Sequence, residues 1–192
     1  VFRAAVFSEP EDEPSGELVL LRDITQEKRI RRNNEALLET SLALPKYPDL
    51  DDLLAYISAT IKYLTDAEGA LVILLDEEKN ELYFKSAVHE NHAAEKRLKE
   101  VRFPADRGIS GKVTRTGRPI IVRDTSTDPD FYPVVDMQAG FTTKSLLDVP
   151  LRTGERIIGV LCAMNKKRGD FDDTDVELLN MISGTVALSI EN

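Results

Sequence analysis

Apolar residues recur at the spacing of an α-helix in three long segments of the chain. In the clearest of them, residues 50–64, leucines and isoleucines fall three or four positions apart behind Asp49, a residue type that caps helix N-termini. Residues 172–190 form a second amphipathic segment. A third, residues 26–44, is rich in Glu, Lys, Arg and Leu. We expect it to end before Pro45, because the residue before a proline avoids the helical conformation.

Short apolar runs predict β-strands between these helices. The expected strands are residues 69–75, 81–88, 101–103, 120–122, 145–152 and 156–164. Two pairs of them are joined by short polar turns and predict antiparallel hairpins. A short helix that opens at Gly108 and stops at Gly117 follows the third strand. Residues 124–143 form a long irregular stretch, and such loops in compact domains are usually functional or disordered.

The order of these elements predicts an α+β fold. From Asp49 onward the chain reads helix, hairpin, strand, short helix, strand, long loop, hairpin, helix. Strands joined by hairpins, with a helix at each end, imply an antiparallel sheet that carries helices on one face and loops on the other.

The N-terminal part has a different pattern. Residues 1–7 and 17–22 are apolar and flank an acidic segment with prolines, which predicts a long hairpin. In the helix that follows, Ile30, Leu37 and Leu44 are spaced by seven residues. This spacing fits either a weakly specified coiled coil or an amphipathic helix lying on its own domain.

The final helix carries two apolar stripes. One contains Val176, Leu179, Ile182, Val186 and Ile190, and the other contains Leu178, Met181, Thr185 and Leu188. One stripe covers the sheet, which leaves the second for a partner. We therefore expect a parallel homodimer held by the terminal helices.

Composition narrows the class of protein. The chain of 192 residues has a hydrophobic fraction of 42% and a formal net charge of −9, which suits a folded domain and argues against nucleic acid as a partner. Cys162 is the only cysteine, so an intramolecular disulfide is excluded and a reducing cytoplasm is expected. The sequence contains no run of about 18 apolar residues that could span a membrane, so we expect no membrane contact by this part of the protein. Both ends fall inside a structural pattern, so we expect a longer protein with an output domain beyond residue 192.

Motifs of common enzymes are absent. The sequence has no HExxH, CxxC, GxSxG or GxGxxG, so we expect no enzymatic activity. His89 and His92, with Glu90 and Glu95, are the only combination that suggests a metal, and two histidines on an ambiguous segment do not make a predicted site.

Three stretches, FPADRGISGKVTRTGRPIIVRD, DPDFYPVVDMQAGFTTKSLLDVPL and IIGVLCAMNKKRGDFDDTDVELL, resemble the body of a GAF domain over residues 46–192. The resemblance implies a six-stranded antiparallel, PAS-like sheet with helices on one face and a ligand pocket under loops on the other. It also implies a regulatory, small-molecule-binding and dimerising module of a bacterial-type signalling protein, of the sensor kinase or nucleotide cyclase class.

The segment ELVLLRDITQEKR is similar to the last strand of PAS domains, which often close with Asp-Ile-Thr before a signalling helix. The resulting domain prediction is a PAS-like C-terminal hairpin at residues 1–25, a linker helix at 26–45 and a GAF domain at 46–192. The alternative is a plain hairpin in which Asp23 or Thr25 caps the following helix, and the two interpretations are compatible.

The pocket residues follow from the resemblance to nucleotide-binding GAF domains and from their chemistry. Free N–H groups at Ile109 and Ser110 would donate hydrogen bonds to an anion, an aromatic ring would cover a base, and polar side chains would bond to its edges. The predicted ligand-binding residues are Phe103, Arg107, Ile109, Ser110, Tyr132, Asp136 and Thr143. A cyclic nucleotide is the most specific candidate ligand.

A second group of residues matches a structural signature of nucleotide-binding members. Asn165, Lys166, Phe171 and Asp175 match it, and Val176 replaces its Glu. We expect Lys166 and Asp175 to form an ion pair between the last strand and the last helix.

Two further departures leave the ligand open. Ala139 lacks a hydroxyl, and Cys162 occupies a position where an acid can lie, so recognition of a base is not assured. Because Cys162 lies within the apolar strand IIGVLCAM, we interpret it as a buried structural thiol. The aromatic residues 131 and 132 would then close a lid over an empty or differently filled pocket. The alternative function is a ligand-free adaptor that only dimerises and aligns signalling helices.

Overall fold

The computed structural model describes residues 23–191. Its helices are α1 (Thr25–Lys46), α2 (Leu50–Leu64), α3 (His92–Leu98), α4 (Gly108–Thr116), α5 (Val134–Ala139) and α6 (Asp173–Glu191). Its strands are β1 (Ala67–Asp76), β2 (Glu81–His89), β3 (Arg102–Pro104), β4 (Ile120–Val122), β5 (Leu146–Thr153) and β6 (Arg156–Lys166). All neighbouring strands are antiparallel, in the order β3-β2-β1-β6-β5-β4, which confirms the predicted α+β fold class.

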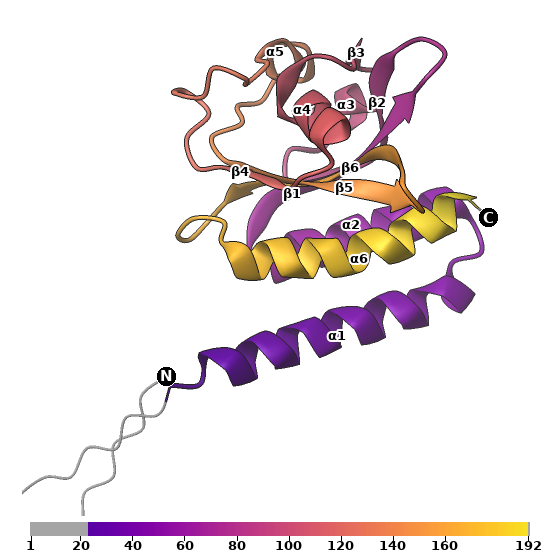
Figure 1. Cartoon of the computed structure of the whole chain (residues 1–192), viewed down its shortest axis with the longest axis vertical. Coiled ribbons are helices and arrows are strands. Elements are labelled where there is room, and N and C mark those ends of the chain that lie inside the picture. The colour runs from indigo at the N-terminus through magenta and orange to yellow at the C-terminus, as the bar shows by residue number, and fades with distance from the viewer. Residues whose placement is uncertain (1–22, 192) are drawn as a thin grey trace, which may run out of the picture.

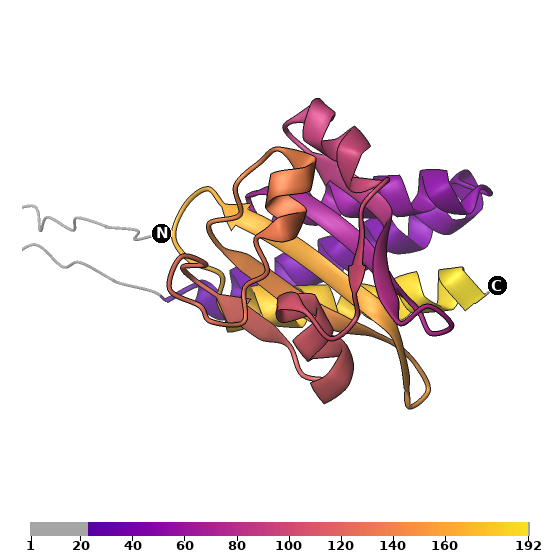
Figure 2. The same cartoon turned by 90° about the horizontal axis from the view of Figure 1, so that it is seen from above.

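The elements form layers around the sheet (Figure 1). Helices α2 and α6 pack side by side on one face, and α1 lies beneath them as a further layer. The short helices α3, α4 and α5, with their connecting loops, cover the other face, and Figure 2 shows them spread over the strands. The sheet therefore separates a helical side from a loop side, as predicted.

Alternation along the central strands builds two cores. On β1, Ala70, Val72 and Leu74 face the helices, whereas Leu71 and Ile73 face the loop side. Successive side chains of a strand point to opposite faces, so a continuous apolar run is expected where both faces are covered. This arrangement explains why the strand sequences are apolar throughout.

Helix α2 starts where the sequence predicts. The Asp49 carboxylate accepts hydrogen bonds from the backbone N–H groups of Asp51 (2.9 Å) and Asp52 (3.2 Å). These contacts satisfy donors that have no partner within the helix. The apolar face, with Leu54 and Ile57 fully buried, then packs on the sheet.

Helix α1 packs on its own domain through small residues. Ala36, Thr40 and Ala43 are buried against the layer below the sheet, whereas Ile30 and Leu37 of the predicted heptad stripe are 57% and 42% exposed. The interpretation of this helix as an amphipathic helix on its own domain is therefore confirmed, whereas the coiled coil stays a prediction. It lies on its own domain, and it keeps an apolar face directed outward.

Two predicted boundaries were wrong. Helix α1 continues through Pro45 to Lys46, because in the last turn the N–H of Tyr47 still donates to Ala43 O at 2.9 Å. The predicted irregular stretch 124–143 contains helix α5, a single short turn structure that ends at Gly140 in the left-handed conformation. The predicted hairpin of residues 1–22 lies outside the described residues.

The expectation that only one stripe of the final helix is covered within the domain was also wrong. Leu178 and Leu179, assigned to different stripes, are both fully buried. Helix α6 contacts the sheet, α2 and α1, so more than one side of it is covered. Leu188 near its end is 63% exposed.

Candidate functional site

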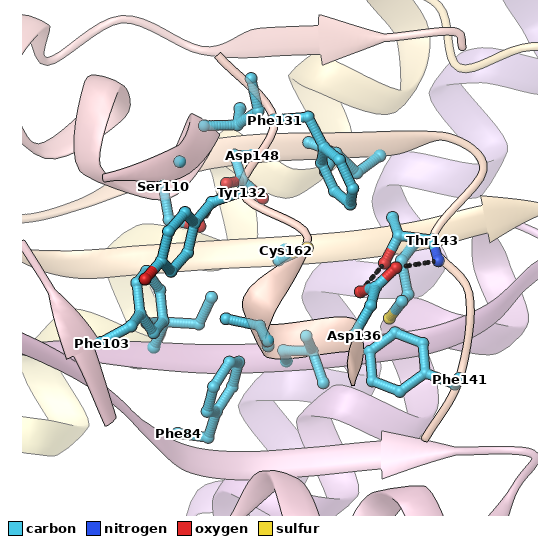
Figure 3. Close-up of a pocket in the computed structure, with 17 residues that line it drawn as sticks. Phe84, Phe103, Ser110, Phe131, Tyr132, Asp136, Phe141, Thr143, Asp148 and Cys162 are labelled. Carbon is cyan, nitrogen blue, oxygen red and sulfur yellow. Dashed lines mark hydrogen bonds between the residues drawn. The ribbon is translucent and has the colours of Figure 1, made fainter. Parts of the chain in front are cut away.

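A small cavity of about 70 Å³ lies on the loop side of the sheet, between β1, β5 and β6 and the lid formed by α4, α5 and the intervening loop. Five aromatic side chains contribute to its lining: Phe84, Phe103, Phe131, Tyr132 and Phe141. Figure 3 shows these rings arranged around the cavity with Ser110, Asp136, Asp148 and Cys162. The predicted location of the pocket, under the short helix and the long loop, is where the structure has it.

Aromatic contacts join the lid to the sheet. The ring centroids of Phe84 and Phe103 are 5.9 Å apart, and those of Phe103 and Tyr132 are 6.2 Å apart. Gly108, at the start of α4, has a φ of +73°, and a Cβ there would lie 3.2 Å from the Cβ of Tyr132. Glycine is favoured at this position for both reasons, and it allows the tyrosine to close over the helix start.

Asp136 and Thr143 line the cavity but bond to each other. The two carboxylate oxygens of Asp136 accept hydrogen bonds from the backbone N–H (2.6 Å) and the hydroxyl (2.8 Å) of Thr143. Burial raises the pKa of Asp136, and the bonds from Thr143 oppose that rise. The pair fastens α5 to the segment before β5, a role that the sequence did not indicate.

Asp148 is the pocket residue that sequence reasoning missed. It lies on β5, is fully buried, and its Oδ2 accepts a hydrogen bond from the Ser110 hydroxyl at 2.7 Å. Its Oδ1 has no hydrogen-bond partner. Burial raises the pKa of this carboxyl to about 6, and the neighbouring Cys162 thiol and Ser110 hydroxyl moderate the rise. A lone aspartate within the apolar run LLDVPL was the available signal.

Cys162 lies opposite Asp148 on the neighbouring strand. The side chain is buried, and burial together with the Asp148 carboxylate raises the pKa of the thiol well above its ordinary value. The thiol therefore stays protonated, which agrees with its interpretation as a structural group.

Only two of the three residues predicted to bind an anion, Ile109, Ser110 and Arg107, line the cavity. Ile109 and Ser110 line the cavity at the start of α4. The side chain of Arg107 is 64% exposed, lies 3.8 Å from the Asp106 carboxylate and is not part of the cavity lining. The structure thus gives no support to the prediction that Arg107 adds positive charge to the pocket.

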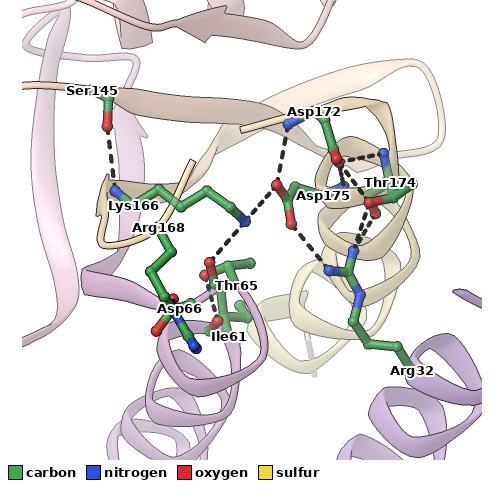
Figure 4. A network of polar contacts seen from close by, with 10 residues as sticks. All are labelled: Arg32, Ile61, Thr65, Asp66, Ser145, Lys166, Arg168, Asp172, Thr174 and Asp175. Atoms are coloured by element: carbon green, nitrogen blue, oxygen red, sulfur yellow. Dashed lines mark hydrogen bonds and ion pairs between the residues drawn. The ribbon is translucent and has the colours of Figure 1, made fainter. Parts of the chain in front are cut away.

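Two residues of the structural signature, Lys166 and Asp175, belong to a network of polar contacts on the helical side of the sheet (Figure 4). Lys166 Nζ donates to Asp175 Oδ2 at 2.8 Å and to Thr65 O at 3.0 Å, so the expected ion pair is present. The buried Asp175 also accepts a hydrogen bond from Arg32 at 3.2 Å, and Arg32 donates to Thr174 O at 2.7 Å. Asp175 therefore joins β6 and the end of α2 to α6 and α1.

The other two signature residues support the same region. Asn165 adopts a φ of +55°, and its side-chain oxygen accepts from Lys144 N (2.6 Å) while its amide donates to Thr142 O (2.8 Å). Phe171 is buried, and the Lys166 ammonium lies 5.4 Å from its ring centroid. The signature thus positions the segment before β5, which carries Thr143.

Within residues 23–191, no group of three or more His, Cys, Asp or Glu side chains is arranged to hold a metal ion. His89 is buried, and its Nδ1 accepts a hydrogen bond from the Asn91 N–H at 2.9 Å. None of the helices described is both long and apolar enough to cross a bilayer.

A helix-covered antiparallel sheet with a lidded pocket on its free face defines a class of small α+β domains. The sequence model of the GAF domain matches residues 49–190, and the chain belongs to this family. GAF domains are regulatory modules found in signalling proteins. The matched range does not include residues 1–25, and no finding supports the predicted PAS fragment there.

Curated relatives include cyclic-nucleotide phosphodiesterases. The chain is 26% identical over 149 residues to a probable 3′,5′-cyclic phosphodiesterase of Caenorhabditis elegans, covering 74% of this chain and 20% of that protein. It is 32% identical over 93 residues to the cone cGMP-specific 3′,5′-cyclic phosphodiesterase subunit alpha′ of Mus musculus, covering 48% of this chain and 11% of that protein. The chain thus spans a fifth or less of these relatives.

Solved structures share the fold. The GAF domain of a phosphoenolpyruvate-protein phosphotransferase from Coxiella burnetii superimposes with a TM-score of 0.72 at 15% identity, covering 87% of this chain and 95% of that one. The corresponding domain from Acinetobacter gives a TM-score of 0.69 at 17% identity, over 85% and 93% of the two chains.

Proposed function

We propose that this chain is a ligand-responsive regulatory module, without catalytic activity of its own, whose pocket binds a small molecule. The observation that carries this proposal is the lidded cavity lined by aromatic rings and by a buried, incompletely bonded carboxylate. Cavities of this kind, mostly apolar with a few polar groups, are typical of binding sites for small molecules.

A physical route joins the pocket to the terminal helices. Asp148 faces the cavity, whereas its strand neighbours Leu147 and Val149 belong to the core under the helices. A shift of β5 on ligand binding would therefore displace α6, because this helix packs on the strand. Asp175 then connects α6 to α1 through Arg32. We propose that these two helices relay the state of the pocket.

The same helices would form a parallel homodimer. The outward face of α1 carries Ile30, Leu37, Leu38 and Leu42, each at least 42% exposed. Large apolar side chains gathered on one helix face are typical of an interaction surface.

We further propose that the chain belongs to a longer cytoplasmic protein of the sensor kinase or cyclase class, whose output domain follows residue 192.

A cyclic nucleotide is one candidate ligand, raised by the names of the relatives. Free N–H groups at the start of α4 would suit a phosphate. The cavity of about 70 Å³ is however several times smaller than the roughly 300–1,000 Å³ of ordinary ligand pockets, so a nucleotide would require the lid to open. The same small volume favours the second candidate function, the adaptor that aligns helices without a ligand.

Thermal unfolding in the presence of ligands tests the proposal. A ligand at 100 times its dissociation constant stabilises the native state by about 2.7 kcal/mol, which corresponds to very roughly 5–11 °C for a domain of this size. We expect such a shift from at least one compound of a broad metabolite panel that includes cyclic AMP and cyclic GMP. A panel that leaves the melting temperature unchanged would instead support the ligand-free adaptor.

A further inference from the structure

One carboxylate oxygen of Asp148 is buried in the cavity without a hydrogen-bond partner. The residue is fully buried, its Oδ2 is bonded to Ser110, and its Oδ1 has no partner. A carboxylate oxygen removed from water without a replacement hydrogen bond is costly. A molecule that fills this cavity would therefore stabilise the site most by presenting a hydrogen-bond donor to Oδ1.

The electrostatic character of the cavity favours a positive charge on that donor. No Lys, Arg or His is among the described residues that line it, whereas a second carboxyl, that of Asp136, is. Arg107 faces solvent, and Arg97 donates to Ala139 O behind α5. The His89 ring lies 5.1 Å from that of Phe141 in a tilted arrangement, and its pKa is lowered mainly by burial, so it brings no positive charge at neutral pH.

The rest of the lining suits a cation as well. Phe84, Phe103, Phe131, Tyr132 and Phe141 surround the space above Asp148 (Figure 3). Aromatic faces attract ammonium and guanidinium groups, most strongly where water is excluded. The volume of about 70 Å³ limits the occupant to a few non-hydrogen atoms unless the lid moves.

We propose that the pocket selects a small organic cation, such as a protonated alkylamine, with Asp148 as its counter-charge and the aromatic rings as its walls. This inference rests on the proposed function of the same pocket and names the class of ligand. An anionic ligand, including the phosphate of a nucleotide, would meet two carboxyls and no balancing side chain within the lining.

Three compounds of similar shape test the choice of charge: isobutylamine, isobutanol and isobutyrate, each titrated at neutral pH and followed by the chemical shifts of pocket amides. We expect the amine to bind, the alcohol to bind about tenfold or more weakly, and isobutyrate to give no saturable shift. Equal affinity for the amine and the alcohol, or tighter binding of isobutyrate, would overturn the inference.

Variants assign the effect to the named groups. Asp148→Asn keeps the size of the side chain and removes its charge, so it should lower the affinity for isobutylamine about tenfold or more and leave isobutanol unchanged. Asp106→Asn, the same change on an exposed side chain outside the cavity, should have no effect. Tyr132→Leu should weaken the amine more than the alcohol, which tests the aromatic contribution even if Asp148→Asn folds poorly.

The outcomes also separate this inference from the proposed function. If isobutyrate or a cyclic nucleotide binds and the amine does not, the pocket is a ligand site and its selectivity for cations is wrong. If none of these compounds and no member of the metabolite panel binds, both proposals fail. Retention of amine binding by Asp148→Asn would refute the assigned counter-charge.

Discussion

Asp148 connects the chemistry of the pocket to the stability of the fold at the scale of single residues. In the unfolded chain the carboxyl is hydrated and has an ordinary pKa of 3.8, whereas burial in the folded domain raises the pKa to about 6. The polar groups beside it are the Cys162 thiol from β6 and the Ser110 hydroxyl from α4, and neither is a cation. Its ionised form is therefore poorly compensated in the folded state.

This shift predicts a dependence of stability on pH. The folded state binds the proton more tightly, so the penalty for burying Asp148 is absent below about pH 4 and reaches about 3 kcal/mol above pH 6. Asp148→Asn cannot ionise. Its free energy of unfolding, relative to the unchanged protein, should therefore rise between pH 4 and pH 7 by up to that amount.

Urea unfolding of both proteins across this range measures the difference, and carboxyls common to both cancel from it. The matched substitution Asp106→Asn should show no comparable rise. A difference between Asp148→Asn and the unchanged protein that stays constant from pH 4 to pH 7 would mean that Asp148 has the same pKa in both states.

At the scale of elements, one buried carboxylate links four segments. Asp175 at the start of α6 accepts from Lys166 of β6 and from Arg32 of α1, and Lys166 also caps the end of α2 through Thr65 O. The other ion pair from α1 to α6, between Arg29 and Glu177 (2.8 Å), is more exposed to solvent, and exposed ion pairs contribute little. The buried side chains of α1, such as Ala36 and Ala43, are small and bury little apolar area. The Arg32 contacts should therefore contribute a large part of the attachment of α1.

Arg32→Ala should loosen α1 while the sheet and α2 remain folded. Loss of one partner of a charged hydrogen-bonded pair costs on the order of 1–3 kcal/mol, and this cost should appear locally as faster amide exchange along α1. Hydrogen exchange resolved by segment is the measurement. Arg31→Ala, a change at the neighbouring exposed position, is the control and should leave exchange in α1 unaltered.

At the scale of the whole molecule, α1 presents its apolar side to solvent on the side of the domain opposite the pocket (Figure 1). Leu38 and Leu42 lie one turn apart and are each 59% exposed. Such a stripe would be covered in a parallel pair of α1 helices from two copies of the chain. The pocket and its lid would stay accessible in that dimer.

Sedimentation at tens of micromolar should therefore show a dimer for the unchanged chain. Replacing Leu38 and Leu42 together by Glu should convert it to monomer, since two charges would have to be buried at the contact. Met137→Glu changes an apolar residue on α5 that is even more exposed, at 78%, on the pocket side, and should leave the dimer intact. A monomer for the unchanged chain at these concentrations would contradict the proposed assembly, although it would leave the pocket proposal standing.

The fold could be predicted from the sequence because its determinants are local. Apolar spacing set the extent of α2 and α6, Asp49 marked a helix start, and Gly117 marked a helix end in the left-handed conformation. The strands followed from short apolar runs and polar turns, and the resemblance to GAF domains indicated the place of the pocket and the pairing of Lys166 with Asp175. Each of these features depends on residues close in sequence or on a motif that the sequence itself contains.

The composition of the candidate site was decided only by the tertiary structure. Whether a residue of an apolar strand faces the helices or the cavity depends on which face each covering element takes, so the sequence did not show that Asp148 faces the cavity. Arg32 meets Asp175 across 143 positions of sequence. Arg107 turns to solvent, and Asp136 bonds to Thr143. These outcomes depend on how the helices, strands and loops pack in three dimensions, which local spacing does not encode.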